Sequence, residues 1–395
     1  MGQLHVRSNA RLKYRTFYMR DTIVIAGSIA HKPWHGGHTW VFLQYLLGFK
    51  KLGWDVVFID WLPIEESGLA ASRGVHYFRE VMNAFHPEGD FALLYDNCRK
   101  SLGLSRERVL ERVARSALLL NVMGFLQDEE ILQAAPKRAF LDIDPGFGQM
   151  WQALGLCTIF RDNDYYLTIG ENIGDPSCQV PTCGLQWIAT RPPVQLDYWP
   201  VHKSGATHFT SVASWRGAYG PIPYKGRTYG LRVHEFRKFF PLPVQSHGRF
   251  ELALSIDPSD AADRERLETS GWHLIEPRSV AADPWQYRDF VQQSGAEFTV
   301  AKNMYVDTQS GWFSDRTVCY LASGKPVLVQ DTGIRHLNPS GKGLLTFRSL
   351  EDAVEGVREI VSNYAVHSAG AREVAAELFD SGKVLSRLLK NLSIN

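Results

Sequence analysis

Short apolar runs alternate with amphipathic segments along most of the chain. Residues 21–27 (DTIVIAG) form the first run, residues 39–52 carry apolar side chains on one helical face, and residues 54–61 (WDVVFIDW) form the second run. Apolar runs without polar alternation are typical of parallel strands that helices cover on both faces. The pattern predicts a strand-helix-strand unit whose first loop, at residues 31–38, lies where open α/β sheets bind ligands.

A second series of strands and helices follows a proline-rich stretch at residues 190–200. Prolines at this density interrupt regular structure and are typical of a stiff connection between domains. Beyond it we predict strands at 207–214, 249–256, 272–275, 296–301 and 325–330, and helices at 258–269, 284–294 and 313–322. The predicted fold class is therefore α/β, with two Rossmann-like, doubly wound domains that face a cleft.

These patterns also predict the domain boundaries. Residues 21–195 form the first α/β domain and residues 205–365 the second, and the helices of 366–395 pack either on their own domain or back on the first one. Residues 1–20 contain basic and aromatic side chains but no acidic one. We interpret them as a disordered leader, and the alternative is an arm that contacts nucleic acid or lipid headgroups.

Composition narrows the class of protein. The chain has 395 residues, of which 45% are apolar, enough for two domains with a core each. The 43 Lys and Arg residues nearly balance the 42 Asp and Glu residues, so the protein as a whole is not built to bind nucleic acid or an anionic membrane. Without a long apolar run or a signal-peptide pattern, we predict a soluble, cytoplasmic protein. The five cysteines are interpreted as reduced structural thiols.

The stretch most informative about function is 310–333 (SGWFSDRTVCYLASGKPVLVQDTG). A turn at Gly311 leads into a helix that Ser314 caps, and a Ser-Gly pair ends the helix before the next strand. A helix start behind a glycine turn presents free backbone N–H groups and the positive end of the helix dipole, which suits a phosphate group. Arg316 and Thr317 add a guanidinium fork and a hydroxyl to this first turn.

Residues 321–327 (LASGKPV) resemble the Ala-x-Gly-x-Pro-Val ending of the donor-site helix in GT-B glycosyltransferases. The resemblance implies that the second domain holds a nucleotide diphosphate sugar and that no metal is needed, because a helix dipole and cations replace it. Cys319 stands where many retaining members carry a ribose-binding Glu, so the ribose contact stays unassigned. The motif also fits an ordinary helix-strand unit of a doubly wound sheet. The donor contacts that the resemblance implies around the helix start are Ser310, Gly311, Ser314, Asp315, Arg316 and Thr317.

The first loop also resembles the GT-B pattern, because Gly36, Gly37 and His38 match a Gly-Gly-His that faces the interdomain cleft. In inverting relatives the His takes the proton of the acceptor hydroxyl, and an imidazole with a pKa of about 6.5 suits that role. In other members the region holds the donor sugar or phosphate. The resemblance makes His38 the catalytic candidate, as a base or as a positioning group, and the alternative is a His that caps the helix.

Cations at strand ends are further donor-site candidates. Trp215 and Arg216 end one predicted strand, Lys225 follows them, and Lys302 ends another strand. Arg216 and Lys225 resemble the Arg and Lys-Gly that meet the diphosphate in retaining GT-B enzymes. A guanidinium at a carboxyl edge can fork onto phosphate oxygens, whereas Lys225 also fits a solvated turn.

The acceptor candidates lie in the first domain, where this fold usually recognises its acceptor. Asp60 lies at the carboxyl end of the strand predicted at 54–61, and Glu171 and Asn172 follow a strand predicted at 165–170; all three carry groups that can hydrogen-bond a hydroxyl. Asp142 and Asp144 also follow a strand, but Asp-Pro-Gly is typical of a tight turn, and we interpret them as a turn rather than a catalytic or metal-binding pair. No metal site is predicted.

Together these features predict a metal-independent glycosyltransferase that moves a sugar from a nucleotide diphosphate donor, its co-substrate, to a small-molecule or polymer acceptor. No other cofactor is predicted, and a nucleic-acid acceptor is not favoured. The alternatives are a nucleotide-sugar epimerase or a sugar phosphorylase of the same fold, and a non-catalytic sugar or nucleotide binder. The nucleobase, the sugar, the stereochemistry and the oligomeric state are not predicted.

Overall fold

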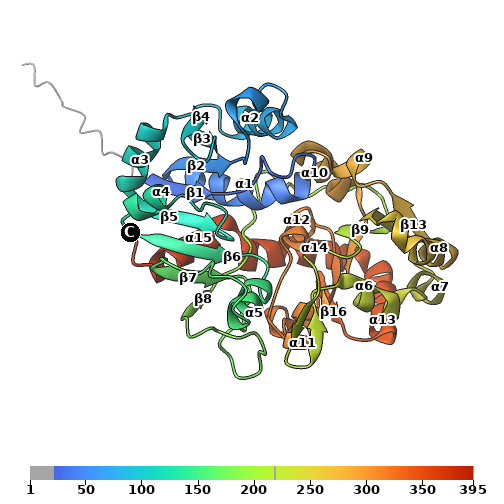
Figure 1. Ribbon diagram of the computed structural model, residues 1–395. Helices are drawn as coiled ribbons and strands as arrows, with labels where there is room; N and C mark the ends of the chain where they lie inside the picture. The colour runs from blue at the N-terminus through green and yellow to red at the C-terminus, as the bar shows by residue number, and fades with distance from the viewer. Residues whose placement is uncertain (1–21, 218, 395) are drawn as a thin grey trace, which may run out of the picture.

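A computed structural model describes residues 22–217 and 219–394, and the predicted basic leader lies outside them. The described residues form two parallel-dominated sheets, each flanked by helices, with the two units side by side (Figure 1). The prediction of an α/β fold with two doubly wound sheets is confirmed. No helix in the described part of the chain is both long enough and apolar enough to cross a membrane.

The first sheet has eight strands within the described residues, in the order β4-β3-β2-β1-β5-β6-β7-β8. All neighbours pair in parallel except β3 and β4. The central strands β1 and β2 are buried along nearly their whole length, as their apolar runs predict. The strands are β1 (Thr22–Ala26), β2 (Asp55–Trp61), β3 (Asp90–Tyr95), β4 (Lys100–Gly103), β5 (Ser116–Val122), β6 (Arg138–Asp142), β7 (Tyr165–Thr168) and β8 (Trp187–Ala189). The helices are α1 (Gly36–Lys51), α2 (Arg73–Phe85), α3 (Arg106–Ala114), α4 (Glu129–Ala134) and α5 (Phe147–Ala153), with a 3₁₀ turn η1 (Glu66–Gly68).

The second sheet has six strands in the described chain, all parallel, in the order β13-β12-β9-β14-β15-β16. A separate antiparallel hairpin, β10-β11, follows β9. The strands are β9 (Phe209–Ser214), β10 (Ile222–Tyr224), β11 (Arg227–Tyr229), β12 (Phe250–Ser255), β13 (Trp272–Ile275), β14 (Ala296–Thr299), β15 (Val327–Gln330) and β16 (Leu344–Phe347). The helices are α6 (Arg232–Phe236), α7 (Leu242–Ser246), α8 (Ala261–Thr269), α9 (Arg278–Ala281), α10 (Pro284–Gln293), α11 (Asn303–Thr308), α12 (Asp315–Ala322), α13 (Leu350–Ser362), α14 (Tyr364–Val374) and α15 (Ser381–Asn391), with a π-helical turn η5 (Ala375–Phe379) and 3₁₀ turns η2 (Arg237–Phe239), η3 (Pro258–Asp260) and η4 (Arg335–Leu337).

The strand order creates one switch point in each sheet. In the first sheet the chain moves outward from β1 to β4 and then returns to β5, on the other side of β1. In the second sheet it moves from β9 to β13 and returns to β14 on the other side of β9. Ligands of open α/β sheets bind beyond the carboxyl ends of strands at such points. A ligand-binding site is therefore expected at the loops after β1, β9 and β14.

Helix α1 connects the two units. The indole Nε1 of Trp40 donates to the carbonyl of Pro284, at the start of α10, over 2.8 Å. At the other end of the helix, a Cβ on Gly48 would lie 2.5 Å from Cδ1 of Leu385, so α1 and α15 approach closely. Figure 1 shows α15, in red, beside the first sheet. The last helix of the chain therefore packs against the unit that begins it.

Candidate active site

The loop after β1 is held in place by Asp60, at the end of β2. Its Oδ2 accepts a hydrogen bond from the Ala30 amide over 2.7 Å, its Oδ1 accepts one from the Trp61 amide, and its side chain is almost completely buried. Burial raises the pKa of Asp60 to about 7, and the backbone donors oppose that rise. Asp60 holds the loop after β1 in place, and its burial does not favour the acceptor contact predicted for it.

His38 lies in the first turn of α1. Its Nε2 is 2.8 Å from the carbonyl oxygen of Ser28, so we assign the proton to Nε2 and the lone pair to Nδ1. Burial, and next the charge of Lys32, lower the pKa of His38 to about 3. A neutral imidazole of such low basicity takes up a proton poorly at neutral pH. Of the two roles predicted for His38, this environment favours positioning over proton transfer.

The glycines before His38 have a packing reason to be glycine. A Cβ on Gly36 would lie 2.0 Å from the carbonyl oxygen of Asp283, and a Cβ on Gly37 would lie 2.9 Å from the ring of Tyr287. Both neighbours belong to the second unit. The pair permits close approach of α10 to α1, and its predicted donor contact stays a prediction.

Lys302 and Asp144 meet across the two units. The ammonium Nζ of Lys302, in the loop after β14, lies 3.0 and 3.1 Å from the two carboxylate oxygens of Asp144, in the loop after β6. The ring of Phe147 lies 4.6 Å from the same Nζ, and that of Tyr305 lies 5.4 Å from it. Burial lowers the pKa of Lys302, and Asp144 opposes this change. Asp144, interpreted from the sequence as part of a turn, thus contributes a carboxylate to the space between the sheets.

Lys32 adds a further cation. Burial lowers the pKa of Lys32, Asp144 raises it and Lys302 lowers it, so the three side chains share one electrostatic environment. Within residues 22–217 and 219–394, Lys32 has no acidic group within ion-pair distance. The carboxylate of Asp144 therefore forms an ion pair with Lys302 and also acts electrostatically on Lys32.

Arg232 is the functional candidate that the sequence reasoning missed. It is the first residue of α6, its side chain is buried, its Nη1 donates to the Ser214 carbonyl over 3.0 Å, and its Nε has no partner in the described chain. Burial, and next the charge of Arg316, lower the pKa of Arg232 to about 10. The hairpin β10-β11 separates Arg232 from β9 in the sequence. The sequence feature that could have pointed to Arg232 is its place directly after a Gly-Leu pair, at the first position of a helix.

Arg316 has a different role from the one predicted. Its Nε donates to Glu297 over 2.7 Å, its Nη2 to the Thr299 hydroxyl over 3.0 Å and its Nη1 to the Val212 carbonyl over 2.8 Å. The Glu297 side chain has no exposed surface. All three guanidinium nitrogens therefore have protein partners, and Arg316 holds β9, β14 and α12 together instead of presenting a fork to a phosphate.

Some hydrogen-bonding groups at the start of α12 and in the turn before it already have partners within the protein. Ser314 accepts a hydrogen bond from the Arg316 amide over 3.2 Å, and the Gly311 amide donates to the Thr332 carbonyl over 2.7 Å. The Ser310 and Thr317 side chains are buried. The donor contacts predicted for this segment stay predictions.

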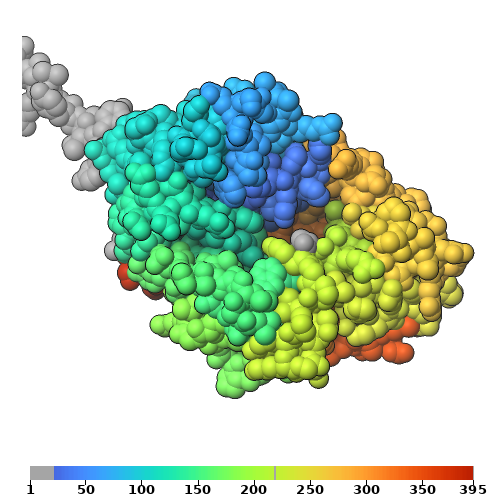
Figure 2. Space-filling model, in the orientation of Figure 1, coloured from blue at the N-terminus to red at the C-terminus, as the bar shows by residue number. Residues whose placement is uncertain are grey.

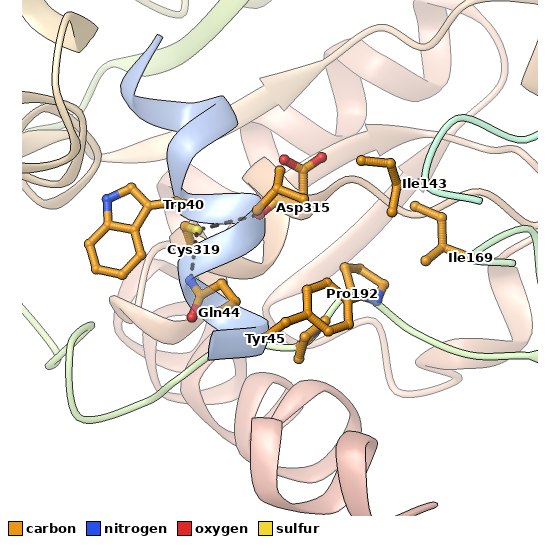
Figure 3. Close-up of a pocket in the computed structure, with 10 residues that line it drawn as sticks. Trp40, Gln44, Tyr45, Ile143, Ile169, Pro192, Asp315 and Cys319 are labelled. Atoms are coloured by element: carbon orange, nitrogen blue, oxygen red, sulfur yellow. Dashed lines mark hydrogen bonds between the residues drawn. The ribbon is translucent and has the colours of Figure 1, made fainter. Parts of the chain in front are cut away.

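Asp315 and Cys319 line a narrow pocket between the units (Figure 3). Burial raises the pKa of Asp315. The Cys319 thiol is buried against Gln44 of α1. The position that holds a ribose-binding Glu in many retaining GT-B enzymes thus faces α1 here. The remaining lining residues are Trp40, Val41, Tyr45, Ile143, Ile169, Pro192 and Pro193.

The remaining predicted donor-site residues are Trp215, Arg216 and Lys225. Arg216 is half exposed and makes a two-pronged contact with Asp260. Trp215 is buried, and its Nε1 donates to Asp263, so it belongs to the core rather than to a ligand surface. Lys225 is exposed at the tip of the β10-β11 hairpin, in agreement with the solvated-turn alternative.

Glu171 and Asn172 connect the units instead of facing open space. The Asn172 amide side chain donates to the carbonyls of Gln309 and Gly333, over 2.9 and 3.2 Å. Glu171 pairs with Arg191 and lies 3.5 Å from Nε2 of His336, in the second unit. The backbone amide of Asn172 also donates to the Ser310 carbonyl over 3.1 Å, so Asn172 secures that loop. Both side chains are engaged by the protein, and the acceptor contacts predicted for them are not favoured.

The space-filling view shows a hollow where blue and green segments of the first unit meet lime and orange segments of the second (Figure 2). Among the described residues, no group of three His, Cys, Asp or Glu side chains is arranged to hold a metal ion. The chemically active groups that meet between the sheets are Lys32, His38, Asp144, Arg232 and Lys302.

No protein-family model matches the sequence, and no curated protein is significantly similar to it. Solved structures match it over nearly its whole length. An α-glucosyltransferase in complex with UDP and DNA has a TM-score of 0.56 at 11% identity, covering 95% of this chain and 99% of that one. HepE from Anabaena, in complex with UDP and glucose, has a TM-score of 0.54 at 11% identity, covering 95% of this chain and 100% of that one.

A putative UDP-N-acetylglucosamine 2-epimerase from Listeria monocytogenes has a TM-score of 0.52 at 12% identity, covering 95% of this chain and 96% of that one. Identities this low carry information about the fold alone. The similarity extends over both sheets and their connection. This protein therefore has the two-domain GT-B fold of nucleotide-sugar glycosyltransferases.

Proposed function

We propose that the protein is a glycosyltransferase that uses a nucleotide diphosphate sugar and binds its diphosphate between Arg232 and Lys302. The observation that carries the proposal is the buried guanidinium of Arg232, which has no carboxylate within ion-pair distance in the described chain. A buried charge without a counter-ion is costly, and an anionic ligand removes that cost. Arg232 contacts the carboxyl end of β9 and Lys302 follows β14, and these two strands form the switch point of the second sheet, where such a ligand is expected.

The two cations also fit the chemistry of the transfer. The bond between the anomeric carbon and the diphosphate oxygen breaks as the acceptor oxygen attacks, and the departing diphosphate gains negative charge. Preorganised cations in a site that excludes water stabilise that charge strongly. No metal is required in this scheme, because Arg232 and Lys302 supply the positive charge.

Asp144 is the proposed proton acceptor. In the free protein its carboxylate holds Lys302. A bound diphosphate competes for the same ammonium group and leaves the carboxylate, on the first-sheet side of the cleft, available to the acceptor hydroxyl. The low basicity of His38 supports this assignment, with the imidazole as a positioning group.

Nucleotide binding to matched variants tests the proposal. UDP is the first ligand to try, because the similar structures of known glycosyltransferases contain it. We expect UDP, GDP, ADP, CDP or TDP to stabilise the protein, by about 2.7 kcal/mol at 100 times the dissociation constant. Arg232→Met should weaken this binding by about 1.5–3 kcal/mol, the usual contribution of a hydrogen bond to a charged group.

Arg237→Ala is the matched control, since Arg237 is half exposed and paired with Asp263. Its affinity for the nucleotide should equal that of the wild type. If no nucleotide stabilises the wild type, or if Arg232→Met binds as tightly as the control, the proposed donor site is wrong.

An epimerase is the second candidate, since a putative epimerase is among the similar structures. The two activities differ in their need for an acceptor. Incubation with a nucleotide sugar alone, followed by analysis of the sugar stereochemistry, separates them. An epimerised nucleotide sugar would identify the second candidate, and an unchanged one that is consumed on addition of an acceptor would identify a transferase.

A further inference from the structure

A group of cations without acidic partners lies at the rim of the cleft, around Trp34. The Cζ of Arg73, at the start of α2, is 5.2 Å from the centre of the Trp34 ring, and the Cζ of Arg278, in α9, is 5.1 Å from it. Both arginines are exposed. Within the described residues, neither guanidinium has an ion-pair partner. The positive guanidinium groups of Arg73 and Arg278, one from each unit, thus lie against the Trp34 indole ring, and no acidic side chain of the described residues pairs with either.

The cationic character continues from this rim into the cleft. The charges of Lys32 and Arg278 both lower the pKa of His35, after the larger effect of burial. Lys32 in turn shares its environment with Asp144 and Lys302. The positive groups Arg278, Lys32 and Lys302 therefore extend from the rim to the proposed reaction centre. A series of like charges raises the local concentration of ions of opposite charge, here anions.

The N-termini of two helices, α1 and α2, add to the positive potential of this region. Neither α1 nor α2 has an acidic residue in its first turn, and the N-cap of α1, His35, makes no side-chain hydrogen bond to the helix. Arg73 stands at the first position of α2, where the helix dipole disfavours a cation. Trp34 adopts a left-handed backbone conformation, with φ of 65°, which is rare for a bulky residue. An arrangement that is unfavourable at several points is typical of a binding site.

We propose that this rim, formed by Lys32, Trp34, His35, Arg73 and Arg278, binds a phosphate group on the acceptor. The acceptor class is accordingly a phosphorylated sugar. Arginine forks match phosphate oxygens in geometry and charge, and a phosphate between Arg73 and Arg278 would relieve their repulsion. Because the two arginines belong to different units, the acceptor phosphate also joins α2 to α9. The inference rests on the proposed glycosyl transfer but concerns other residues.

The test compares acceptors that differ only in charge. Wild-type protein, saturated with the nucleotide that stabilises it, is titrated with glucose 6-phosphate, glucose, glucuronate and a short single-stranded DNA. We expect glucose 6-phosphate to bind most tightly, and its affinity to fall with added salt, because the rim is exposed. Arg73→Ala and Arg278→Ala should each weaken this binding about tenfold or more. The affinity for the nucleotide should not change.

Arg79→Ala is the control, because Arg79 is exposed on the same helix but on another face. It should bind glucose 6-phosphate like the wild type. Restoration of part of the affinity by Arg73→Lys would confirm a role for the charge. Equal binding of glucose and glucose 6-phosphate, tighter binding of glucuronate or DNA, or unchanged binding by both alanine variants would each overturn the inference. Because nucleotide binding is measured separately, its loss in the wild type would indicate failure of the proposed function instead.

Discussion

The ammonium group of Lys302 lies 3.0 Å from the carboxylate of Asp144, and this ion pair joins the second sheet to the first. The Lys302 side chain is 9% exposed and that of Asp144 is 21% exposed. With so little solvent to screen it, the pair affects both the stability of the protein and the chemistry of the cleft.

The first prediction concerns stability. Asp144→Asn should lower the free energy of unfolding by about 2–3 kcal/mol, less than for a fully buried pair, because Lys302 and Lys32 then face each other without a counter-charge. Lys302→Met combined with Asp144→Leu should recover part of this loss. Urea unfolding of Asp144→Leu, Lys302→Met and the double variant that combines these two substitutions measures the coupling. Strictly additive losses would mean that the pair contributes nothing.

The second prediction distinguishes two candidate bases. Asp144→Asn should lower kcat by about 10²–10⁴ if Asp144 takes the acceptor proton. His38→Gln should lower kcat by less than about tenfold, since the His38 imidazole is a poor base at neutral pH. Steady-state kinetics with the donor identified by nucleotide binding provides both values. The reverse order of the two losses would return the role of base to His38.

The third prediction contrasts two buried arginines. Arg316→Met leaves the Glu297 carboxylate buried without its partner, and should destabilise the protein by about 3–5 kcal/mol. Arg232→Met removes a buried charge that has no carboxylate partner in the described chain, and should leave the stability of the free protein unchanged or increased. Thermal unfolding without ligand checks both. Severe destabilisation by Arg232→Met would show that Arg232 is structural.

The fourth prediction concerns pH. Burial raises the pKa of Asp60 from 3.8 to about 7, so the folded state holds this proton more tightly than the unfolded state. The resulting stabilisation is complete below about pH 4 and is lost as the pH rises through 7, at about 1.4 kcal/mol per unit of pKa difference. Asp60→Asn should therefore flatten the decline in unfolding free energy between these pH values.

Asp142→Asn is the comparison for the pH experiment, because burial raises the pKa of Asp142 to about 6 and its effect falls in an overlapping range. Asp142→Asn should remove a smaller part of the decline in unfolding free energy than Asp60→Asn does. A decline in Asp60→Asn as steep as in the wild type would show that the Asp60 carboxyl does not titrate in this range.

Most of the fold was predictable because its causes are local. The run at 21–27 became β1, and the run at 54–61 became β2, since a short uninterrupted apolar segment is typical of a parallel strand that is covered on both faces. Helix α12 begins two residues later than predicted, at Asp315, because Ser314 caps it from outside. Boundaries of the predicted elements shifted by up to three residues, and the structure adds elements that were not predicted, among them the β10-β11 hairpin and β16.

The site was less predictable, as Arg316 and Arg232 show. From the sequence, Arg316 at a helix start behind a glycine turn was the better phosphate ligand, and Arg232 drew no attention. Glu297 lies 19 positions before Arg316 and became its partner only when β14 was placed beneath α12. Asp60 likewise lies at the carboxyl end of a strand, as a ligand-binding carboxylate would, yet the loop after β1 covers it.

Apolar periodicity and capping act over a few residues, so they predict the alternation of strands and helices, the two α/β units and the ligand-binding edges. Which charged side chains have partners, and which remain free between the sheets, follows from the packing of the folded chain. Whether a charge is neutralised depends on residues such as Asp144 and Lys302, 158 positions apart, which are brought together by packing and by no local pattern.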